Sequence, residues 1–188
     1  MEGKAIIFSA PSGSGKTTIV QSLLQHIPKL KFSISATTRN RRPNEVDGID
    51  YHFLAESDFR NKILHGDLLE WEEVYTNTFY GTLKEEVERI WSGGDHVIFD
   101  VDVKGGVKLK EELGDKALAI FVKVPSIDIL ESRLRARSTE DEKTLRMRID
   151  KAAEEMKEER NFDEVLINEH LDEAKDLAKQ MVEEFIAS

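Results

Sequence analysis

An eight-residue segment near the start of the chain, Ala10 to Thr17, combines residue types that can hold phosphate groups. Gly13 and Gly15 allow successive backbone N–H groups to turn towards one anion, because glycine adopts left-handed backbone angles at little cost. Lys16 can neutralise the outer phosphates, and the hydroxyl group of Thr17 can reach a magnesium ion. The segment therefore predicts a loop that binds the phosphates of a nucleotide.

The residues on either side supply the elements that such a loop needs. Residues 4–9 are mostly apolar with β-branched side chains, which is typical of a short buried strand in a parallel sheet. Residues 16–27 place apolar side chains at helical spacing before Pro28 ends the pattern. A strand, a glycine-rich loop and a helix in this order favour phosphate binding over a solvated turn of glycine and serine.

One position of the loop departs from the usual pattern GxxxxGK[ST]. Ala10 occupies the place of the first glycine. Because alanine adopts positive φ angles only at a cost, phosphate binding requires ordinary backbone angles at Ala10.

The composition limits the classes of protein that fit. The 188 residues, 39% hydrophobic and 34% charged, suit one α/β unit with small insertions. The longest apolar run, Ala117 to Val122, is too short to span a membrane, and the chain enters its first strand without room for a signal peptide, so we expect a cytoplasmic protein. The net charge of −10 argues against a general nucleic-acid or membrane surface. Cysteine is absent and the five histidines are scattered, so we expect no disulfide and no transition-metal site.

Basic residues are nevertheless concentrated in two places. Residues 29–42 contain five basic side chains and no acidic one, and a second group consists of Arg133, Arg135, Arg137, Arg146 and Arg148. Arginine side chains form paired hydrogen bonds to phosphate and carboxylate oxygens, so both groups are candidates for binding small anions.

The middle of the chain differs from the parts around it. Strand-like runs at 32–36, 51–54, 68–75 and 79–81, with a helix at 56–65, indicate a mixed β region. Alternating helices and strands then continue at 83–91, 96–102, 107–113, 117–124, 126–137, 141–160 and 165–167. A final helix carries Leu171, Ala174, Ala178, Met181 and Phe185 on its predicted core face.

These patterns predict an α/β fold in three parts. Residues 1–32, 83–125 and 149–188 form a core with a parallel sheet, residues 33–82 form the mixed β insertion, and residues 126–148 form a small helical part with a hinge candidate at 138–140.

Several spaced motifs, in the same order, resemble the guanylate kinase family over nearly the whole chain. They are the loop 12–17, the run 35–43, the block 45–51, Glu70-Trp71, the segment 80–82 and the segment 100–102. The resemblance implies a three-layer P-loop kinase fold with an inserted mixed-β GMP-binding region and a small helical lid. It also implies magnesium-dependent transfer of the γ-phosphate of ATP to GMP.

The resemblance assigns one set of residues to the acceptor, GMP. The residues that match its phosphate site are Arg39, Arg42, Tyr51 and Tyr80, and those that match its guanine site are Ser35, Glu70, Thr82 and Asp102. The residue types suit these roles, because arginine forks bind a phosphate dianion and a carboxylate accepts from the N1–H and N2 amino groups of guanine. On spacing alone, Arg39 and Arg42 also fit a solvated basic turn, and Glu70 fits an exposed strand face.

A second set is assigned to ATP, magnesium and phosphoryl transfer. The residues that match the ATP site are Ser12, Gly13, Ser14, Gly15, Lys16, Thr17, Thr18 and Asn168, and Thr17 and Asp100 match the metal site. Asp100 resembles an acid that orients magnesium and its waters or holds Lys16. The residues expected to assist transfer are Lys16, Arg39, Arg133, Arg137 and Arg148. Arg135 and Arg146 receive no role.

Two other functions remain open at this point. Some proteins with this fold are inactive modules that bind phosphorylated peptides, although such modules usually lack a working phosphate loop, and fold alone does not imply activity. A kinase for another nucleoside monophosphate would need Ser35, Glu70 and Thr82 to face a different base. The sequence fits a monomer or a homodimer equally well.

Overall fold

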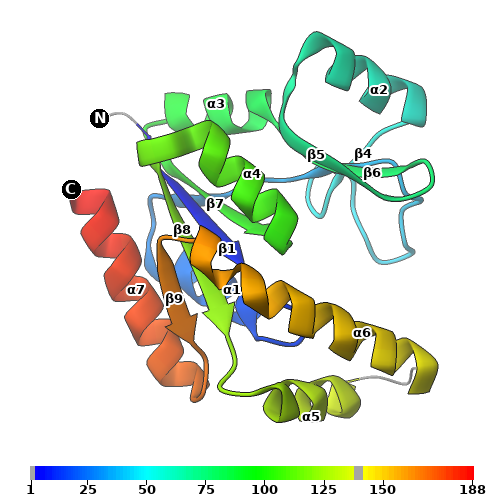
Figure 1. Ribbon diagram of the computed structural model, residues 1–188. Helices are drawn as coiled ribbons and strands as arrows, with labels where there is room; N and C mark the ends of the chain where they lie inside the picture. Colours follow the sequence, from blue (N-terminus) through cyan, green and yellow to red (C-terminus); the bar gives the residue numbers. More distant parts are fainter. Residues whose placement is uncertain (1–2, 138–141) are drawn as a thin grey trace.

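The computed structural model describes residues 3–137 and 142–188, and its centre is a parallel sheet (Figure 1). The strands lie in the order β2-β7-β1-β8-β9, with every neighbouring pair parallel. Their bounds are β1 Ala5–Ser9, β2 Leu30–Phe32, β7 His96–Val101, β8 Ala117–Lys123 and β9 Glu164–Ile167. The strand β1, which leads into the phosphate loop, therefore lies in the middle of the sheet.

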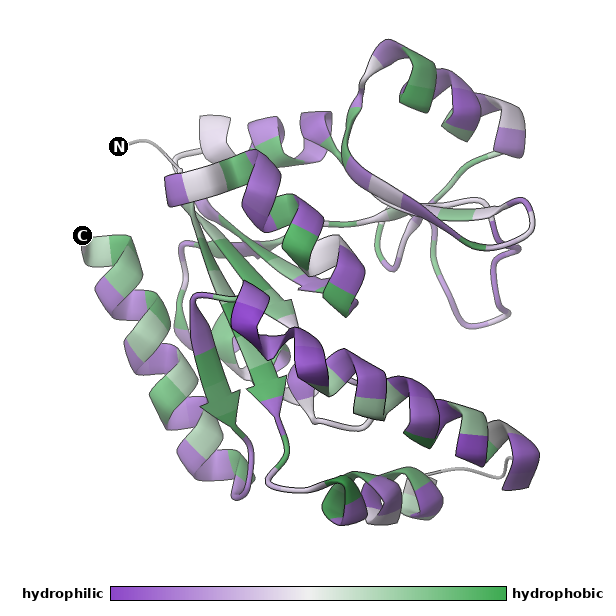
Figure 2. Cartoon of the chain, in the orientation of Figure 1, coloured by the Kyte–Doolittle hydropathy of each residue, from purple (hydrophilic) through white to green (hydrophobic). Residues whose placement is uncertain are grey.

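Helices cover both faces of this sheet, which makes three layers. Side chains of α1 (Lys16–His26) and α7 (Leu171–Ala187) pack with Ile6 and Phe8 of β1 on one face. Side chains of α3 (Lys84–Ser92) and α4 (Val103–Leu113) pack with Ala5 and Ile7 on the other. Because both faces are covered, the central strands are mostly apolar, as Figure 2 shows. The predicted α/β fold with a parallel core sheet is confirmed.

The insertion forms a separate sheet with the strand order β4-β3-β6-β5. Its strands are β3 Ala36–Thr37, β4 His52–Phe53, β5 Leu68–Tyr75 and β6 Thr78–Leu83. The pair β3–β4 is parallel, whereas β3–β6 and β5–β6 are antiparallel, so the predicted mixed β character is confirmed. Phe59 of α2 (Glu56–His65) stacks on Phe79 of β6 and closes a small apolar core.

The helices α5 (Ile127–Arg137) and α6 (Glu142–Glu155) share their own apolar cluster, which includes Leu130, Leu134 and Leu145. The hydroxyl oxygen of Ser126 accepts from the N–H of Ile129 at 3.3 Å and so caps α5. Figure 1 shows the inserted sheet and the α5–α6 pair projecting from the same side of the core. The hinge candidate at 138–140 lies outside the described residues.

The predicted strand at 32–36 is wrong, because the chain changes sheets there. Phe32 ends β2 in the core sheet, and Ala36 begins β3 in the inserted sheet. Between them the Ser33 N–H still donates to the carbonyl oxygen of Ile98, at 3.0 Å, before the chain leaves the core. The alternation of apolar and small residues continues across this change, so the sequence pattern does not reveal it.

The helix predicted at 107–113 begins four residues earlier, at Val103. The carboxylate of Asp102 accepts from the N–H of Gly105 at 2.8 Å and caps the helix. Gly105 and Gly106 are part of the first turn, although glycine usually weakens a helix. A Cβ atom at Gly106 would lie only 2.1 Å from Ser9 Oγ, so close packing of α4 on β1 requires glycine here.

Two other helices differ from the sequence predictions. The long helix expected at 141–160 ends as an α-helix at Glu155 and continues as a 3-10 helix, Met156–Asn161; a second 3-10 helix spans Gly114–Lys116. In α7 the fully buried side chains are Ala174, Ala178 and Val182, whereas Leu171 is 37% exposed. Across the described ranges, no helix is long and apolar enough to cross a membrane.

Candidate active site

Two adjoining cavities lie where β1 and β7 end. The phosphate-loop cavity, of 440 Å³, is lined by residues 10–18, Tyr51, residues 100–102 and three side chains of α6, namely Arg148, Lys151 and Glu155. The acidic cavity, of 260 Å³, is lined by Ser35, Tyr51, Glu70, Glu72, Val74, Tyr80, Gly81, Asp100, Val101, Asp102 and Gly105. Tyr51 and residues 100–102 border both cavities, so the two form one cleft with two compartments.

The phosphate loop has the backbone geometry that anion binding requires. Gly13 and Gly15 adopt φ angles of 91° and 87°, which side-chain-bearing residues rarely adopt. Ser14 closes the turn, because its N–H and its hydroxyl group both donate to the carbonyl oxygen of Pro11, at 3.2 and 2.8 Å. The first turn of α1 carries no acidic side chain, so no residue of that turn offsets the positive end of the helix dipole.

The expectation for Ala10 is confirmed. Among the described residues, Asn77 is the only non-glycine residue with a positive φ angle, so Ala10 has ordinary backbone angles. Its side chain is 6% exposed and packs in the apolar cluster beneath the loop. Alanine at this position therefore causes no backbone strain.

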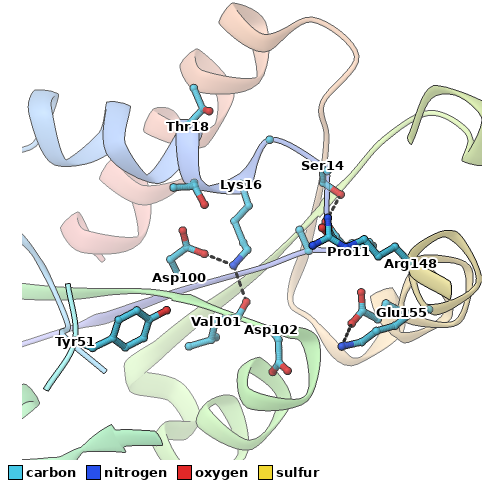
Figure 3. A pocket seen from close by; sticks show the side chains of 16 residues that line it. Pro11, Ser14, Lys16, Thr18, Tyr51, Asp100, Val101, Asp102, Arg148 and Glu155 are labelled. Carbon is cyan, nitrogen blue, oxygen red and sulfur yellow. Dashed lines mark hydrogen bonds and ion pairs between the residues drawn. The ribbon is translucent and has the colours of Figure 1, made fainter. Parts of the chain in front are cut away.

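Lys16 and Asp100 form an ion pair on the floor of the phosphate-loop cavity (Figure 3). The ammonium group also donates to the carbonyl oxygen of Val101 at 2.8 Å. Both side chains are about 15% exposed, so the pair is only partly screened by water. One of the two roles considered for Asp100, holding Lys16, is thus directly visible.

Asn168 lies behind the loop, in contact with its backbone. Its amide group donates to the carbonyl oxygen of Ser14 at 2.7 Å, and a Cβ atom at Gly15 would lie 2.4 Å from that nitrogen. Within the described part of the chain, the buried Oδ1 atom of Asn168 has no hydrogen-bond partner. Asn168 can therefore support the loop and still accept one hydrogen bond.

The arginines predicted to assist phosphoryl transfer occupy different surroundings. Arg148 of α6 lines the phosphate-loop cavity (Figure 3). Arg133 of α5 instead donates to the carbonyl oxygens of Asn168, at 3.0 Å, and Glu169, at 3.4 Å. Arg137 ends α5, and its side chain lies outside the described structure. Arg135, which received no role, is paired with Glu131 and Glu142 on the surface of the α5–α6 pair.

The acidic cavity brings together the residues predicted to bind guanine. The hydroxyl group of Thr82 donates to Glu70 Oε1 at 2.8 Å, and Ser35 and Asp102 line the same cavity. A Cβ atom at Gly105 would lie 3.5 Å from Glu70 Oε2 and 3.2 Å from Asp102 Oδ1, so both carboxylates approach this glycine. Burial raises the pKa of Glu70 to about 7, against the hydrogen bond from Thr82, which lowers it.

Arg39 lies at the edge of this cavity and is held by its neighbours. Its Nε–H donates to the hydroxyl group of Tyr80 at 3.1 Å, and its guanidinium group lies 5.0 Å from the centre of the Tyr51 ring. Glu45 accepts two parallel hydrogen bonds from Arg39, at 2.6 and 2.7 Å, and a third from the N–H of Arg42, at 2.9 Å. These bonds, above all those from Arg39, lower the pKa of Glu45 to about 2, so Glu45 is ionised at neutral pH.

The structure does not bring every predicted residue into the cleft. The predicted residues that line neither cavity are the exposed Arg42, together with Arg39, Thr82, Arg133 and Asn168. Thr17 lines the phosphate-loop cavity with an exposed side chain. Sequence reasoning also missed residues that border the cleft or hold its side chains: Glu45, Glu72, Lys151 and Glu155. The sequence did contain a signal for Glu72. It lies two residues after Glu70 on the same strand, and such residues share one face of the strand.

A parallel sheet with a phosphate loop after its central strand, and a second cavity beside the first, defines a P-loop phosphotransferase with room for two ligands. A family model described as "Guanylate kinase" matches residues 2–185, and the chain belongs to the guanylate kinase family.

Individual relatives agree with this assignment. The chain is 46% identical over 183 residues to the guanylate kinase of Salinibacter ruber, covering 97% of each protein. It is 48% identical over 185 residues to the guanylate kinase of Bacteroides fragilis, covering 98% of this chain and 91% of the relative. The crystal structure of guanylate kinase from Anaplasma phagocytophilum is similar with a TM-score of 0.75 and 26% identity, covering 97% of this chain and 85% of that one.

Proposed function

We propose that this protein is an ATP:GMP phosphotransferase that converts GMP and ATP into GDP and ADP. The observation that carries the proposal is the shared border of the two cavities, formed by Tyr51 and residues 100–102. A nucleotide triphosphate on the phosphate loop and a monophosphate in the acidic cavity would bring their phosphate groups together at this border.

ATP is placed in the phosphate-loop cavity. The backbone N–H groups of residues 12–18 surround its β- and γ-phosphates, and Lys16 neutralises their charge. Asn168, which is proposed to contribute to the ATP site, holds the loop from behind, because its amide group donates to the carbonyl oxygen of Ser14.

Magnesium fits the residues at this end of the cleft. The Thr17 hydroxyl and the Asp100 carboxylate are hard oxygen donors, which Mg²⁺ prefers, and both line the phosphate-loop cavity. In proteins Mg²⁺ is usually bound by one or two carboxylates together with substrate phosphates and water. When bound, the ion would neutralise charge on the phosphates of ATP.

GMP is placed in the acidic cavity. Glu70 accepts from the N1–H and the amino group of guanine, with Asp102 near the amino group and Ser35 and Thr82 as hydroxyl contacts. Arg39 reaches the phosphate of GMP together with the phenol groups of Tyr51 and Tyr80, and Arg42 joins them from the exposed loop.

The reaction requires positioning more than acid–base chemistry. The attacking phosphate oxygen of GMP is already ionised, so a general base is unnecessary and no covalent enzyme intermediate forms. Arg148 would neutralise negative charge on the phosphoryl group during transfer. Arg133 and Arg137 would join it after movement of the 126–148 part. Closure of that part and of the 33–82 insertion over the core would exclude water, the competing acceptor.

An acceptor screen tests the proposal. Release of ADP from ATP and magnesium is measured with GMP, AMP, UMP and CMP offered separately. We expect turnover with GMP and little with the other acceptors. Turnover with a different monophosphate would assign another substrate, and GMP binding without any turnover would favour a phosphopeptide-binding module.

A further inference from the structure

Glu72 lies on the same face of β5 as Glu70 and extends the floor of the acidic cavity. Side chains alternate between the two faces of a strand, so Glu70, Glu72 and Val74 share one face. All three line the acidic cavity, whereas Trp71 and Glu73 do not. Glu72 is therefore placed beside the proposed guanine site by the geometry of the strand.

The two oxygens of the Glu72 carboxylate have different surroundings. Oε1 accepts from the ammonium group of Lys104 on α4 at 3.0 Å. Oε2 is buried, and within the described residues it has no hydrogen-bond partner. A buried carboxylate oxygen without a donor is costly and requires an explanation.

The charge around Glu72 makes a purely structural role a poor explanation. Glu70, Asp100 and Asp102 line the same cavity, so Glu72 adds a fourth carboxylate to a confined space. Like charges in close proximity repel, and the ion pairs Lys16–Asp100 and Lys104–Glu72 neutralise only two of the four. Such a cavity suits a ligand that is rich in hydrogen-bond donors.

Guanine is such a ligand, since its N1–H and its amino group together present three N–H donors. Glu70 Oε1 already accepts from Thr82, and Asp102 Oδ1 accepts from the N–H of Gly105. These bonds use part of the acceptor capacity of the cavity and leave Glu72 Oε2 as an acceptor that has no hydrogen-bond partner among the described residues.

We propose that Glu72 is a further specificity-determining residue, whose free carboxylate oxygen accepts a hydrogen bond from the 2-amino group of guanine. This inference rests on the proposed function. It implies that the protein distinguishes GMP from IMP, which lacks only that amino group, partly through Glu72. Lys104 donates to the other oxygen, Oε1.

The test compares kcat/KM for GMP and IMP in the purified full-length protein, with dissociation constants where turnover is slow. In Glu72→Ala we expect the ratio of the GMP value to the IMP value to fall about tenfold, as expected for a hydrogen bond to a charged group. Glu73→Ala is the matched control, because it removes the same charge from the neighbouring position on the other face, and its ratio should equal that of the unaltered protein.

A second variant separates the hydrogen bond from the ion pair. Lys104→Met removes the partner of Oε1 but keeps the carboxylate, so it should retain most of the preference for GMP. An unchanged ratio in Glu72→Ala, or an equally large loss of preference in Lys104→Met, would overturn the role of Glu72. Absence of GMP turnover in the unaltered protein would instead refute the proposed function itself.

Discussion

The ammonium group of Lys16 is bound to the carboxylate of Asp100 and to the carbonyl oxygen of Val101, so the cation of the phosphate loop is fixed at the end of β7. This contact links the strand before α4 to the loop before α1, and it lies on the border between the two cavities. Lys16 is thus held at the place where the phosphoryl group would be transferred.

Lys16→Met should abolish most phosphoryl transfer. Loss of a cation that meets transition-state charge typically lowers kcat on the order of a hundredfold or more. The measurement is ADP release at saturating ATP and GMP, with circular dichroism as the check on folding. Normal turnover in a folded Lys16→Met protein would refute the role of the loop.

Stability and activity can be separated at this pair. Lys16→Met leaves Asp100 partly buried without its partner, which lowers the free energy of unfolding. The double variant Lys16→Met/Asp100→Asn should recover thermal stability without recovering activity, because no charge then remains unpaired.

Glu70→Ala should weaken the binding of GMP far more than the binding of ATP. The variant removes an acceptor for the donors of guanine, and hydrogen bonds to charged groups contribute about 1.5–3 kcal/mol each. We expect kcat/KM for GMP to fall by more than about tenfold, with an unchanged KM for ATP. An equal loss for both substrates would show that Glu70 supports the fold and does not recognise the base.

The pH dependence of GMP use should report on Glu70. Its pKa is raised to about 7, so in the free protein it is protonated below that pH and presents an O–H to the N–H donors of guanine. We therefore expect kcat/KM for GMP to rise as pH increases through about 7. This rising limb of the pH profile should be absent in Glu70→Gln. The phosphate of GMP titrates near pH 6 and contributes a separate step that remains in Glu70→Gln. A limb near pH 7 that persists in this variant would contradict the assignment.

Glu45 should position Arg39 for the phosphate of GMP. Its paired hydrogen bonds fix the guanidinium group, so Glu45→Gln should raise the KM for GMP roughly fivefold to tenfold and leave the KM for ATP unchanged. The ratio of kcat/KM for GMP to kcat/KM for IMP should stay constant, since Glu45 does not act on the base. If Glu45 merely competed with phosphate for Arg39, the same variant would bind GMP more tightly. Glu56→Gln, which breaks an exposed Arg–Glu pair on α2, is the matched control.

Local patterns were sufficient to predict the elements around the phosphate loop. Periodicity and helix-breaking residues such as Pro28 can be read from the sequence. They are sufficient for the strand before the loop, the helix after it and the helix at 56–65. The strand break after Phe32 and the start of α4 at Val103 depend on which surface the chain meets next. Gly106 illustrates this dependence, because a Cβ atom there would collide with Ser9 and crowd Phe162, neither of which is near it in the sequence.

The site was predictable where a residue acts through its own chemical type. Lys16 was found this way, from its place in the phosphate-loop pattern, whereas Glu70 and Asp102 were assigned by the resemblance to the guanylate kinase family; the structure places all three on the cleft. Glu45 was missed, because its role lies in its contact with Arg39, which only the folded loop fixes. Glu72 was missed, because only the folded cavity shows that one of its oxygens is buried without a partner among the described residues.

The most direct test of the account follows the transferred phosphoryl group itself. ATP labelled at the γ-phosphate is incubated with magnesium, GMP and the protein, and the labelled products are separated. We predict that the label appears in the β-phosphate of GDP, with little free phosphate, and that Lys16→Met produces neither. Label released mainly as free phosphate, or retained in ATP while GMP is bound, would contradict phosphoryl transfer between two adjoining nucleotides.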